Sequence, residues 1–270
     1  MTPQYPEPQR QEMILPEGRL ETAWWGPGPD EAPSLVLLHE GLGSVTIWRD
    51  FPARLAAATG CGVFAYSRFG YGHSDTVQLP RPLTYLHDDA RLVPRVLDGI
   101  GIARCVLIGH SDGGSIAAIA GAENDPRVRG LVLIAAHFFV EEEQVEGVAA
   151  VRRRWFESDL RDRLARHHAD PDTAFFGWND TWLNPQFHSF DISRELSQIR
   201  APMLVMQGQY DEHATEEQVR FAARKAGGPT QTIILPGAHH SPHLEMPEQT
   251  VAPIVGFVHR VLHWPKPLAA

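Results

Sequence analysis

The chain has 270 residues, of which 43% are hydrophobic, so it is long enough to bury one large core. Its formal net charge of −9 argues against a nucleic-acid partner, because such surfaces are normally basic. Residues 1–8 have neither the charged nor the apolar region of a signal peptide, and no apolar run reaches the length of a membrane span. We therefore expect a cytoplasmic protein without a membrane partner, and the sequence is compatible with a monomer or a homodimer.

The first half of the chain predicts strands that alternate with helices. Short apolar runs predict strands at 19–25, 35–38, 62–66, 105–108 and 131–135. Helical patterning predicts helices at 51–59, at 83–97 with an interruption near Pro94, and at 113–120. Such alternation is typical of an α/β fold with a mostly parallel central sheet that helices cover on both faces.

The alternation stops between residues 139 and 200, where a helical pattern at 148–164 precedes an aromatic-rich stretch. It resumes with predicted strands at 203–208 and 232–235 and a closing helix at 251–262. We therefore expect residues 1–138 to form the first part of a core, 139–200 a helical insertion, and 201–270 the second part of the core.

A G-x-S-x-G motif, Gly109-His110-Ser111-Asp112-Gly113, lies between the strand at 105–108 and the following helix. A serine on such a tight strand-to-helix turn stands clear of the sheet, and the flanking glycines avoid clashes that side chains would cause there. Ser111 is therefore the candidate nucleophile.

An acid and a histidine follow Ser111, each beyond the end of a predicted strand. Asp211 comes just after the strand at 203–208, and His240 lies in the loop after the strand at 232–235. A serine hydroxyl needs a histidine to take its proton, and the histidine needs a carboxylate to fix its tautomer. We predict that Ser111, Asp211 and His240 form a catalytic triad.

The oxyanion hole is expected to use the backbone N–H of Asp112 and a second N–H from the loop after the strand at 35–38. Gly41 is the first candidate for that second donor and Leu42 is the alternative. Donors of this kind each contribute about 3 kcal/mol to stabilising the charge of a tetrahedral intermediate.

The chain resembles the α/β-hydrolase superfamily, close in pattern to bacterial carboxylesterases and to carbon–carbon bond hydrolases of meta-cleavage pathways. The matching segments span almost the whole chain: they are 39–43, 66–74, the motif at 109–113, 208–211 and 240–247. The resemblance implies that residues 139–200 form a helical cap over the active site. It also aligns His240 with the catalytic base, puts His239 where a glycine is usual, and leaves His243 to pack or bond locally.

One position departs from the family pattern, because Glu40 replaces the glycine of the usual His-Gly pair in the oxyanion loop. The Glu40 carboxylate either bonds to nearby backbone, as is common in turns, or positions water or a polar group of the substrate.

Aromatic residues of the insertion are candidates for the substrate pocket, where they would give an apolar roof and exclude water. These candidates are Phe138, Trp155, Phe176, Trp178 and Trp182. The alternative is that they form the small core of the insertion itself. At least one of them should face the cavity.

These features predict a serine hydrolase that cleaves a small to medium, partly apolar carboxylic ester through an acyl-enzyme on Ser111. One alternative is a carbon–carbon bond hydrolase of ring-fission diketones, for which Arg68 or Arg152-Arg153-Arg154 would supply basic pocket groups. Another is a non-catalytic small-molecule sensor on the same fold. Dehalogenases and epoxide hydrolases are disfavoured, since both need an aspartate at position 111.

No cofactor is expected. The 14 histidines raise the question of a metal site, but no HExxH or paired CxxC spacing occurs, so we expect no metal. Cys61 and Cys105 lie in or beside apolar segments and are expected to be buried free thiols.

Overall fold

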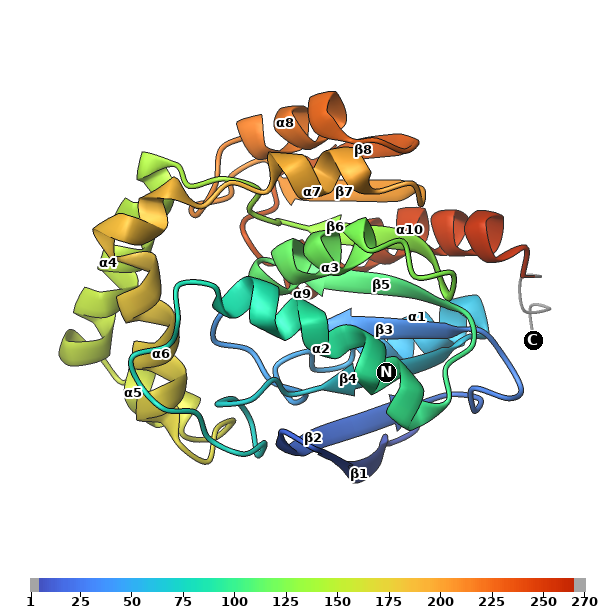
Figure 1. Ribbon diagram of the computed structural model, residues 1–270, viewed down its shortest axis with the longest axis horizontal. Helices are drawn as coiled ribbons and strands as arrows, with labels where there is room; N and C mark the ends of the chain where they lie inside the picture. The colour runs from blue at the N-terminus through green and yellow to red at the C-terminus, as the bar shows by residue number, and fades with distance from the viewer. Residues whose placement is uncertain (1–4, 265–270) are drawn as a thin grey trace.

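An eight-stranded sheet in the order β1-β2-β4-β3-β5-β6-β7-β8 organises the computed structural model, which describes residues 5–264 (Figure 1). Its strands are Gln9–Leu15 (β1), Gly18–Trp25 (β2), Ser34–Leu38 (β3), Gly62–Tyr66 (β4), Cys105–His110 (β5), Val128–Ile134 (β6), Met203–Gly208 (β7) and Thr230–Leu235 (β8). Strands β3 to β8 pair in parallel, and β2 pairs antiparallel with both β1 and β4. The predicted α/β class is therefore confirmed.

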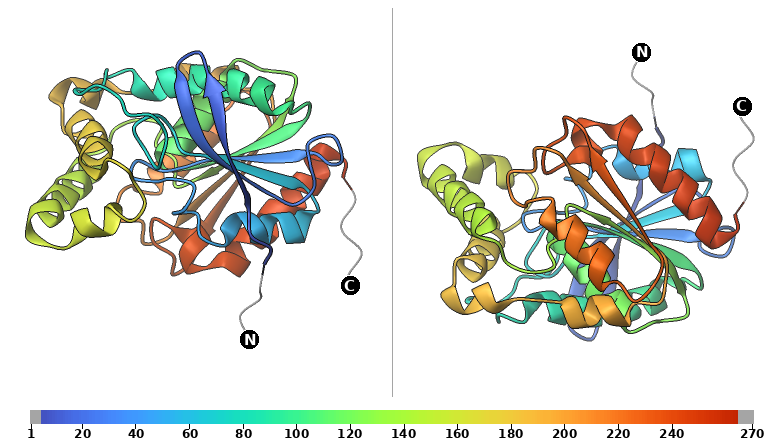
Figure 2. Two further views of the ribbon diagram at one scale, coloured as in Figure 1. Left: turned by 90° about the horizontal axis from the view of Figure 1, so that it is seen from below. Right: turned by 90° about the horizontal axis from the view of Figure 1, so that it is seen from above.

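Helices cover both faces of this sheet, as Figure 2 shows edge-on. One face packs against Phe51–Thr59 (α1) and Pro247–Leu262 (α10), and the other against Tyr85–Ile100 (α2), Asp112–Ala122 (α3), Ser193–Gln198 (α7) and Glu217–Lys225 (α8). All residues of β3, β4, β5 and β7 are buried. Continuous apolar runs suit these strands because helices shield both of their faces from water.

Two predictions about single elements were wrong. Strand β1 was not expected, because its sequence QRQEMIL is mostly polar and exposed; it is an edge strand held by antiparallel pairing with β2. The interruption near Pro94 is absent, and α2 runs through this proline as one helix. Its buried face, which includes Leu86, Val93 and Leu97, packs into the core and outweighs the hydrogen bond that proline cannot make.

The predicted insertion contains Glu142–Glu157 (α4), Leu160–Leu164 (α5), Pro171–Trp182 (α6) and the 3₁₀ turn Pro185–Ser189 (η1). These four elements, here called the helical insertion, extend beyond the carboxyl ends of the parallel strands (Figure 1). The helical pattern predicted at 148–164 corresponds to two helices, which are separated where Ser158 adopts extended dihedral angles and its hydroxyl donates to the Arg154 carbonyl. Helix α7 packs on α3 and α8, so it belongs with the sheet rather than with the four projecting elements.

The loop between β8 and α10 contains one further short helix, Pro242–Glu245 (α9). Cys61 and Cys105 are both buried free thiols. Over residues 5–264, none of the helices combines the length and the apolar character that crossing a membrane requires.

Candidate active site

Ser111 lies at a sharp turn between β5 and α3, with φ +54° and ψ −121°. A side chain at Gly109 would overlap the backbone of Gly113, and one at Gly113 would overlap the backbone of Leu38. Both glycines of the motif are therefore needed for close backbone packing. The turn holds the Ser111 side chain, which is mostly buried, at the carboxyl edge of the sheet.

The three predicted triad residues meet at this edge. Ser111 Oγ lies 3.0 Å from His240 Nε2, and His240 Nδ1 lies 2.8 Å from Asp211 Oδ1. Asp211 follows β7, and His240 lies in the loop after β8. The Asp211 carboxylate thus holds the imidazole with Nδ1 protonated, which leaves Nε2 free to accept the Ser111 proton.

Burial of Asp211 and His240 opposes charge on both groups, but their mutual attraction prevails. The pKa of Asp211 is lowered by His240 and by the backbone N–H of His213, in spite of burial. The pKa of His240 is raised by Asp211, again in spite of burial. The carboxylate is therefore ionised near neutral pH, and the imidazole is a stronger base than a free histidine.

The loop after β3 is anchored by its buried His39. His39 Nδ1 lies 2.7 Å from the Glu40 carbonyl oxygen, and the Arg68 backbone N–H donates to His39 Nε2. The Arg68 guanidinium also donates to the Glu40 carbonyl, at 2.9 Å. Since the peptide bond is trans, the N–H of Gly41 points away from Arg68.

The Glu40 side chain lies among histidines. Its carboxylate is 3.6 Å from His110 Nδ1, and His110 Nε2 lies 2.8 Å from the carbonyl oxygen of His240. Burial works against ionisation of Glu40, but His110 and His240 bring its pKa below the ordinary value. Glu40 therefore places a negative charge close to His240.

A small pocket of about 120 Å³ opens next to Ser111. Its described lining residues come from the β3 loop, the serine turn, the end of β6, the helical insertion and the loops that carry the acid and the base. They are Glu40, Gly41, Leu42, Ser111, Asp112, His137, Gln144, Val148, Val151, Trp178, Trp182, His213 and His240. Ser111 and His240 thus share one cavity with the three predicted oxyanion-hole residues, and Asp211 contacts His240 from outside this lining.

Only part of the predicted aromatic set reaches this pocket. Trp178 and Trp182 line it, whereas Phe138, Trp155 and Phe176 are not among its described lining residues. Trp155 stacks on Phe175 with ring centroids 4.0 Å apart and forms a core within the insertion. Phe138 is fully buried in the main core, and Phe176 packs against the insertion's own core.

Asp112 belongs to a buried polar network behind the pocket. Its carboxylate accepts hydrogen bonds from the Tyr85 hydroxyl at 2.5 Å and from Trp182 Nε1 at 3.2 Å. Arg68 lies 3.9 Å from Asp112 and donates to Asp89 at 2.8 Å. Arg68 is therefore neutralised inside the protein and does not reach the pocket.

The arginine run suggested as a source of basic pocket groups is also occupied elsewhere. Arg152 pairs with Asp180 and donates to Asn179 at 2.9 Å, while Arg153 and Arg154 are exposed on α4. None of the described residues that line the pocket is an arginine or a lysine.

Five residues that line the pocket were not predicted from the sequence: His137, Gln144, Val148, Val151 and His213. His137 Nε2 lies 3.3 Å from Ser111 Oγ. His137 follows β6, which pairs with β5 on the side opposite β3, the strand that precedes the loop of Gly41. The available signal was a histidine just beyond the end of the strand next to the nucleophile strand. His213, two residues after Asp211, also lines the pocket.

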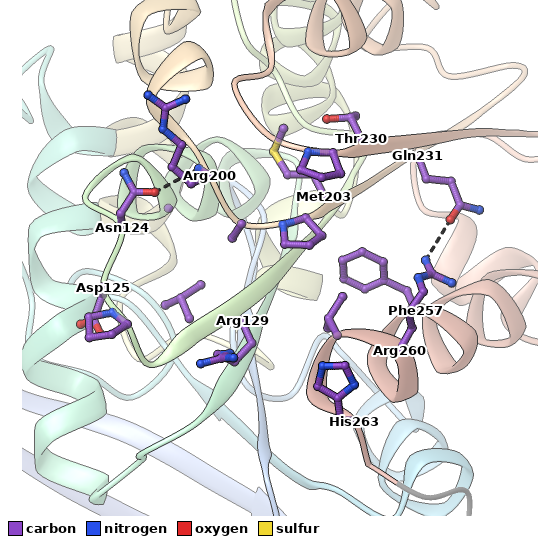
Figure 3. Close-up of a pocket in the computed structure, with 17 residues that line it drawn as sticks. Asn124, Asp125, Arg129, Arg200, Met203, Thr230, Gln231, Phe257, Arg260 and His263 are labelled. Carbon is purple, nitrogen blue, oxygen red and sulfur yellow. Dashed lines mark hydrogen bonds between the residues drawn. The ribbon is translucent and has the colours of Figure 1, made fainter.

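A larger cleft of about 790 Å³ lies away from these residues, at the amino ends of β6, β7 and β8 (Figure 3). Arg129, Arg200 and Arg260 line it together with apolar side chains. Its described lining residues include no serine, carboxylate and histidine arranged as at Ser111, so the smaller pocket is the candidate active site. Across residues 5–264, no group of three or more histidine, cysteine or carboxylate side chains has an arrangement that could hold a metal ion.

Comparison with known proteins agrees with this architecture. The sequence pattern of the alpha/beta hydrolase family matches residues 35–253, so the chain belongs to that family. It is 30% identical over 163 residues to 2-succinyl-6-hydroxy-2,4-cyclohexadiene-1-carboxylate synthase of Salmonella paratyphi B, and 29% identical over 163 residues to the protein of that name from Salmonella agona. These matches cover 60% of this chain and 58% of each relative, which is less than two thirds of the relatives' length.

Solved structures share the fold at low sequence identity. Proline iminopeptidase of Mycobacterium smegmatis matches with a TM-score of 0.76 and 20% identity over 93% of this chain and 98% of that one. The enol-lactonase of Burkholderia xenovorans LB400 matches with a TM-score of 0.71 and 22% identity over 92% of this chain and 99% of that one. At such identities the likeness establishes the fold and leaves the reaction to be argued from the site.

Proposed function

We propose that this protein is a serine hydrolase that cleaves a small, partly apolar carboxylic ester through an acyl-enzyme on Ser111. The observation that carries the proposal is the unbroken hydrogen-bond chain from Asp211 through His240 to Ser111 Oγ, which ends in a pocket. A non-catalytic sensor has no physical need for all three groups in this geometry.

The proposed reaction begins when His240 Nε2 takes the Ser111 proton and Oγ attacks the ester carbonyl carbon. The carbonyl π electrons move to oxygen, and the N–H groups of Asp112 and Gly41 stabilise that charge. Leu42 remains the alternative to Gly41. The imidazolium then protonates the departing alcohol, and a water activated by His240 hydrolyses the acyl-enzyme.

Pocket size and charge favour a small substrate without a carboxylate group. The cavity of about 120 Å³ is smaller than the roughly 300–1,000 Å³ usual for pockets that bind drug-sized ligands. Its wall includes the Glu40 carboxylate and no described arginine or lysine, so an anionic group would lack a charge partner. This argues against the ring-fission hydrolase, and against the activity of the relatives whose name gives a carboxylate as their product.

The helical insertion is proposed to act as a cap. Helices α4 and α6 supply Gln144, Val148, Val151, Trp178 and Trp182 to the pocket wall. Two indoles and two valines exclude water from the acyl group, which strengthens the electrostatic interactions around the reacting carbonyl.

The test is turnover of p-nitrophenyl esters from acetate to octanoate by the wild type and by Ser111→Ala, in parallel with a ring-fission diketone. We expect serine-dependent turnover that is highest for the shortest acyl groups. Cleavage of the diketone alone would replace the proposal with the carbon–carbon hydrolase. Loss of neither activity in Ser111→Ala would show that Ser111 is not the nucleophile.

A further inference from the structure

A second histidine approaches the nucleophile from β6. His137 Nε2 lies 3.3 Å from Ser111 Oγ, and His240 Nε2 lies 3.0 Å from the same atom. Both Ser111 and His137 are mostly buried, and the rings of His137 and His240 are nearly parallel, with centroids 5.7 Å apart. The Ser111 hydroxyl can donate its single proton to only one of them.

The backbone after β6 is held in an unusual conformation that places His137. Ala135 has φ +48°, a region that residues with a β-carbon seldom adopt, and its N–H donates to the Met206 carbonyl. The Ser115 hydroxyl donates to the His137 carbonyl at 2.6 Å. Strained backbone of this kind concentrates at functional sites, where the surroundings hold it in place.

Gln144 fixes the tautomer of His137. The amide oxygen of Gln144 accepts the backbone N–H of Glu141 at 2.9 Å, so the amide nitrogen faces the other way, where it meets His137 Nδ1. An amide nitrogen can only donate, so His137 Nδ1 must accept. In a neutral imidazole the remaining proton is then on Nε2, the atom that faces Ser111 Oγ.

The support for Gln144 comes from the loop that also carries Asp211. The Glu141 carboxylate accepts hydrogen bonds from Thr215 Oγ1 at 2.5 Å and from Gln218 Nε2 at 2.9 Å. Two chains of contacts therefore run from the region after β7 to Ser111 Oγ. One passes through Asp211 and His240, and the other through Glu141, Gln144 and His137.

We propose that His137 is a second catalytic histidine, a neutral Nε2–H donor that stabilises negative charge on Ser111 Oγ. This inference rests on the proposed function. Oγ loses its proton to His240 as its bond to the carbonyl carbon forms. In deacylation that bond breaks, the electron pair returns to Oγ, and Oγ takes a proton back from His240. His137 keeps its proton throughout and supplies only a hydrogen bond.

The surroundings of His137 keep it neutral during this cycle. Burial holds the pKa of His137 well below its usual range, and the positive charge that forms on His240 lowers it further. His240 differs because Asp211 compensates its charge. His240 Nε2 therefore acts as an acceptor and His137 Nε2–H as a donor toward the same atom, Ser111 Oγ.

The first experiment reads the tautomer without using any substrate. Protein labelled with ¹⁵N-histidine should show His137 as the Nε2–H form in the wild type. In Gln144→Glu the new carboxylate can only accept a hydrogen bond, so it should favour a donor at Nδ1 and convert His137 to the Nδ1–H form. An Nδ1–H form in the wild type would overturn the proposal, even if the esterase activity is confirmed.

The second experiment measures the reactivity of Ser111 itself. A fluorophosphonate reacts with an activated serine whatever the natural substrate is, and an ester burst separates acylation from deacylation. We expect His137→Leu to slow phosphonylation, acylation and deacylation by about 10- to 100-fold with little change in KM, as expected for one lost donor. His137→Gln keeps a side-chain N–H at a similar reach and should restore most of the rate.

His188→Leu, a change of the same type at an exposed histidine of η1, is the control for folding and handling. Equal rates for folded His137→Leu and the wild type would overturn the proposal. If the wild type reacts with the fluorophosphonate but cleaves no ester, the proposed substrate class fails while the role of His137 remains measurable.

Discussion

The indole of Trp178 in α6 lies directly on the α-carbon of Gly41, so a β-carbon at position 41 would overlap the indole ring. The contact joins the helical insertion to the loop proposed to supply an oxyanion donor. Glycine at this position is therefore required by packing across the pocket.

Gly41→Ala should therefore cost activity more than stability. The added methyl group must displace either Trp178 or the loop, and losing one oxyanion donor lowers kcat by about 100- to 1000-fold. The measurement is kcat for the best p-nitrophenyl ester, together with the melting temperature. Gly256→Ala is the matched control: Gly256 is exposed in α10, nothing lies near its missing side chain, and the change should leave kcat unaltered. Wild-type kcat for Gly41→Ala would contradict the prediction that the contact with Trp178 keeps the oxyanion loop in place.

Alanine substitutions of Trp178 and Trp155 should have different effects, because Trp178 lines the pocket and Trp155 belongs to the core of the insertion. Trp178→Ala removes a wall of the pocket and should move the preferred acyl chain to a longer length. Trp155→Ala breaks the stack on Phe175 and should lower stability by about 3–5 kcal/mol without changing the preferred length. Chain-length profiles and urea unfolding of both variants test this, and a shifted profile for Trp155→Ala would contradict the assignment.

The pH dependence of kcat/KM should reflect the pKa of His240, which its pairing with Asp211 raises. Because Asp211 raises the pKa of His240, the acid limb of kcat/KM should lie above 6.5, the ordinary value. Asp211→Asn removes that stabilisation, so the limb should move to lower pH while kcat falls by about 10⁴-fold. Glu212→Gln keeps an acceptor for the backbone N–H of His240, so it should move the acid limb to lower pH by a smaller amount and largely retain kcat. A limb unmoved by Asp211→Asn would mean that another group controls it.

Stability should depend strongly on Asp89. Its buried carboxylate pairs with Arg68 at 2.8 Å and with Arg81 at 3.4 Å. Asp89→Asn would remove the negative charge that neutralises two buried guanidinium groups, which should lower the free energy of unfolding by about 3–5 kcal/mol. Glu216→Gln, in an exposed pair with Arg220, should change stability by no more than about 0.5 kcal/mol. Urea unfolding measures both, and equal effects would show that the buried network is not important for stability.

Local sequence patterns were enough to predict strands β2 to β8 and the three residues that meet as a triad. Continuous apolar runs such as Leu35–Leu38 mark buried strands wherever they occur, and carboxyl ends of neighbouring parallel strands lie at one edge of the sheet. Ser111, Asp211 and His240 each follow such a strand, so their meeting could be predicted from local patterns alone.

The other side chains that reach Ser111 depend on tertiary packing, which local patterns do not encode. Trp155 and Trp178 are both tryptophans of the insertion, yet one stacks within it and the other lines the pocket, because helix rotation and packing set the direction of each side chain. His137 shows the same limit. Its proposed role depends on the orientation of the Gln144 amide. Contacts with Glu141, and between Glu141 and the loop after β7, set this orientation. No local pattern encodes contacts between segments that are so far apart in the chain.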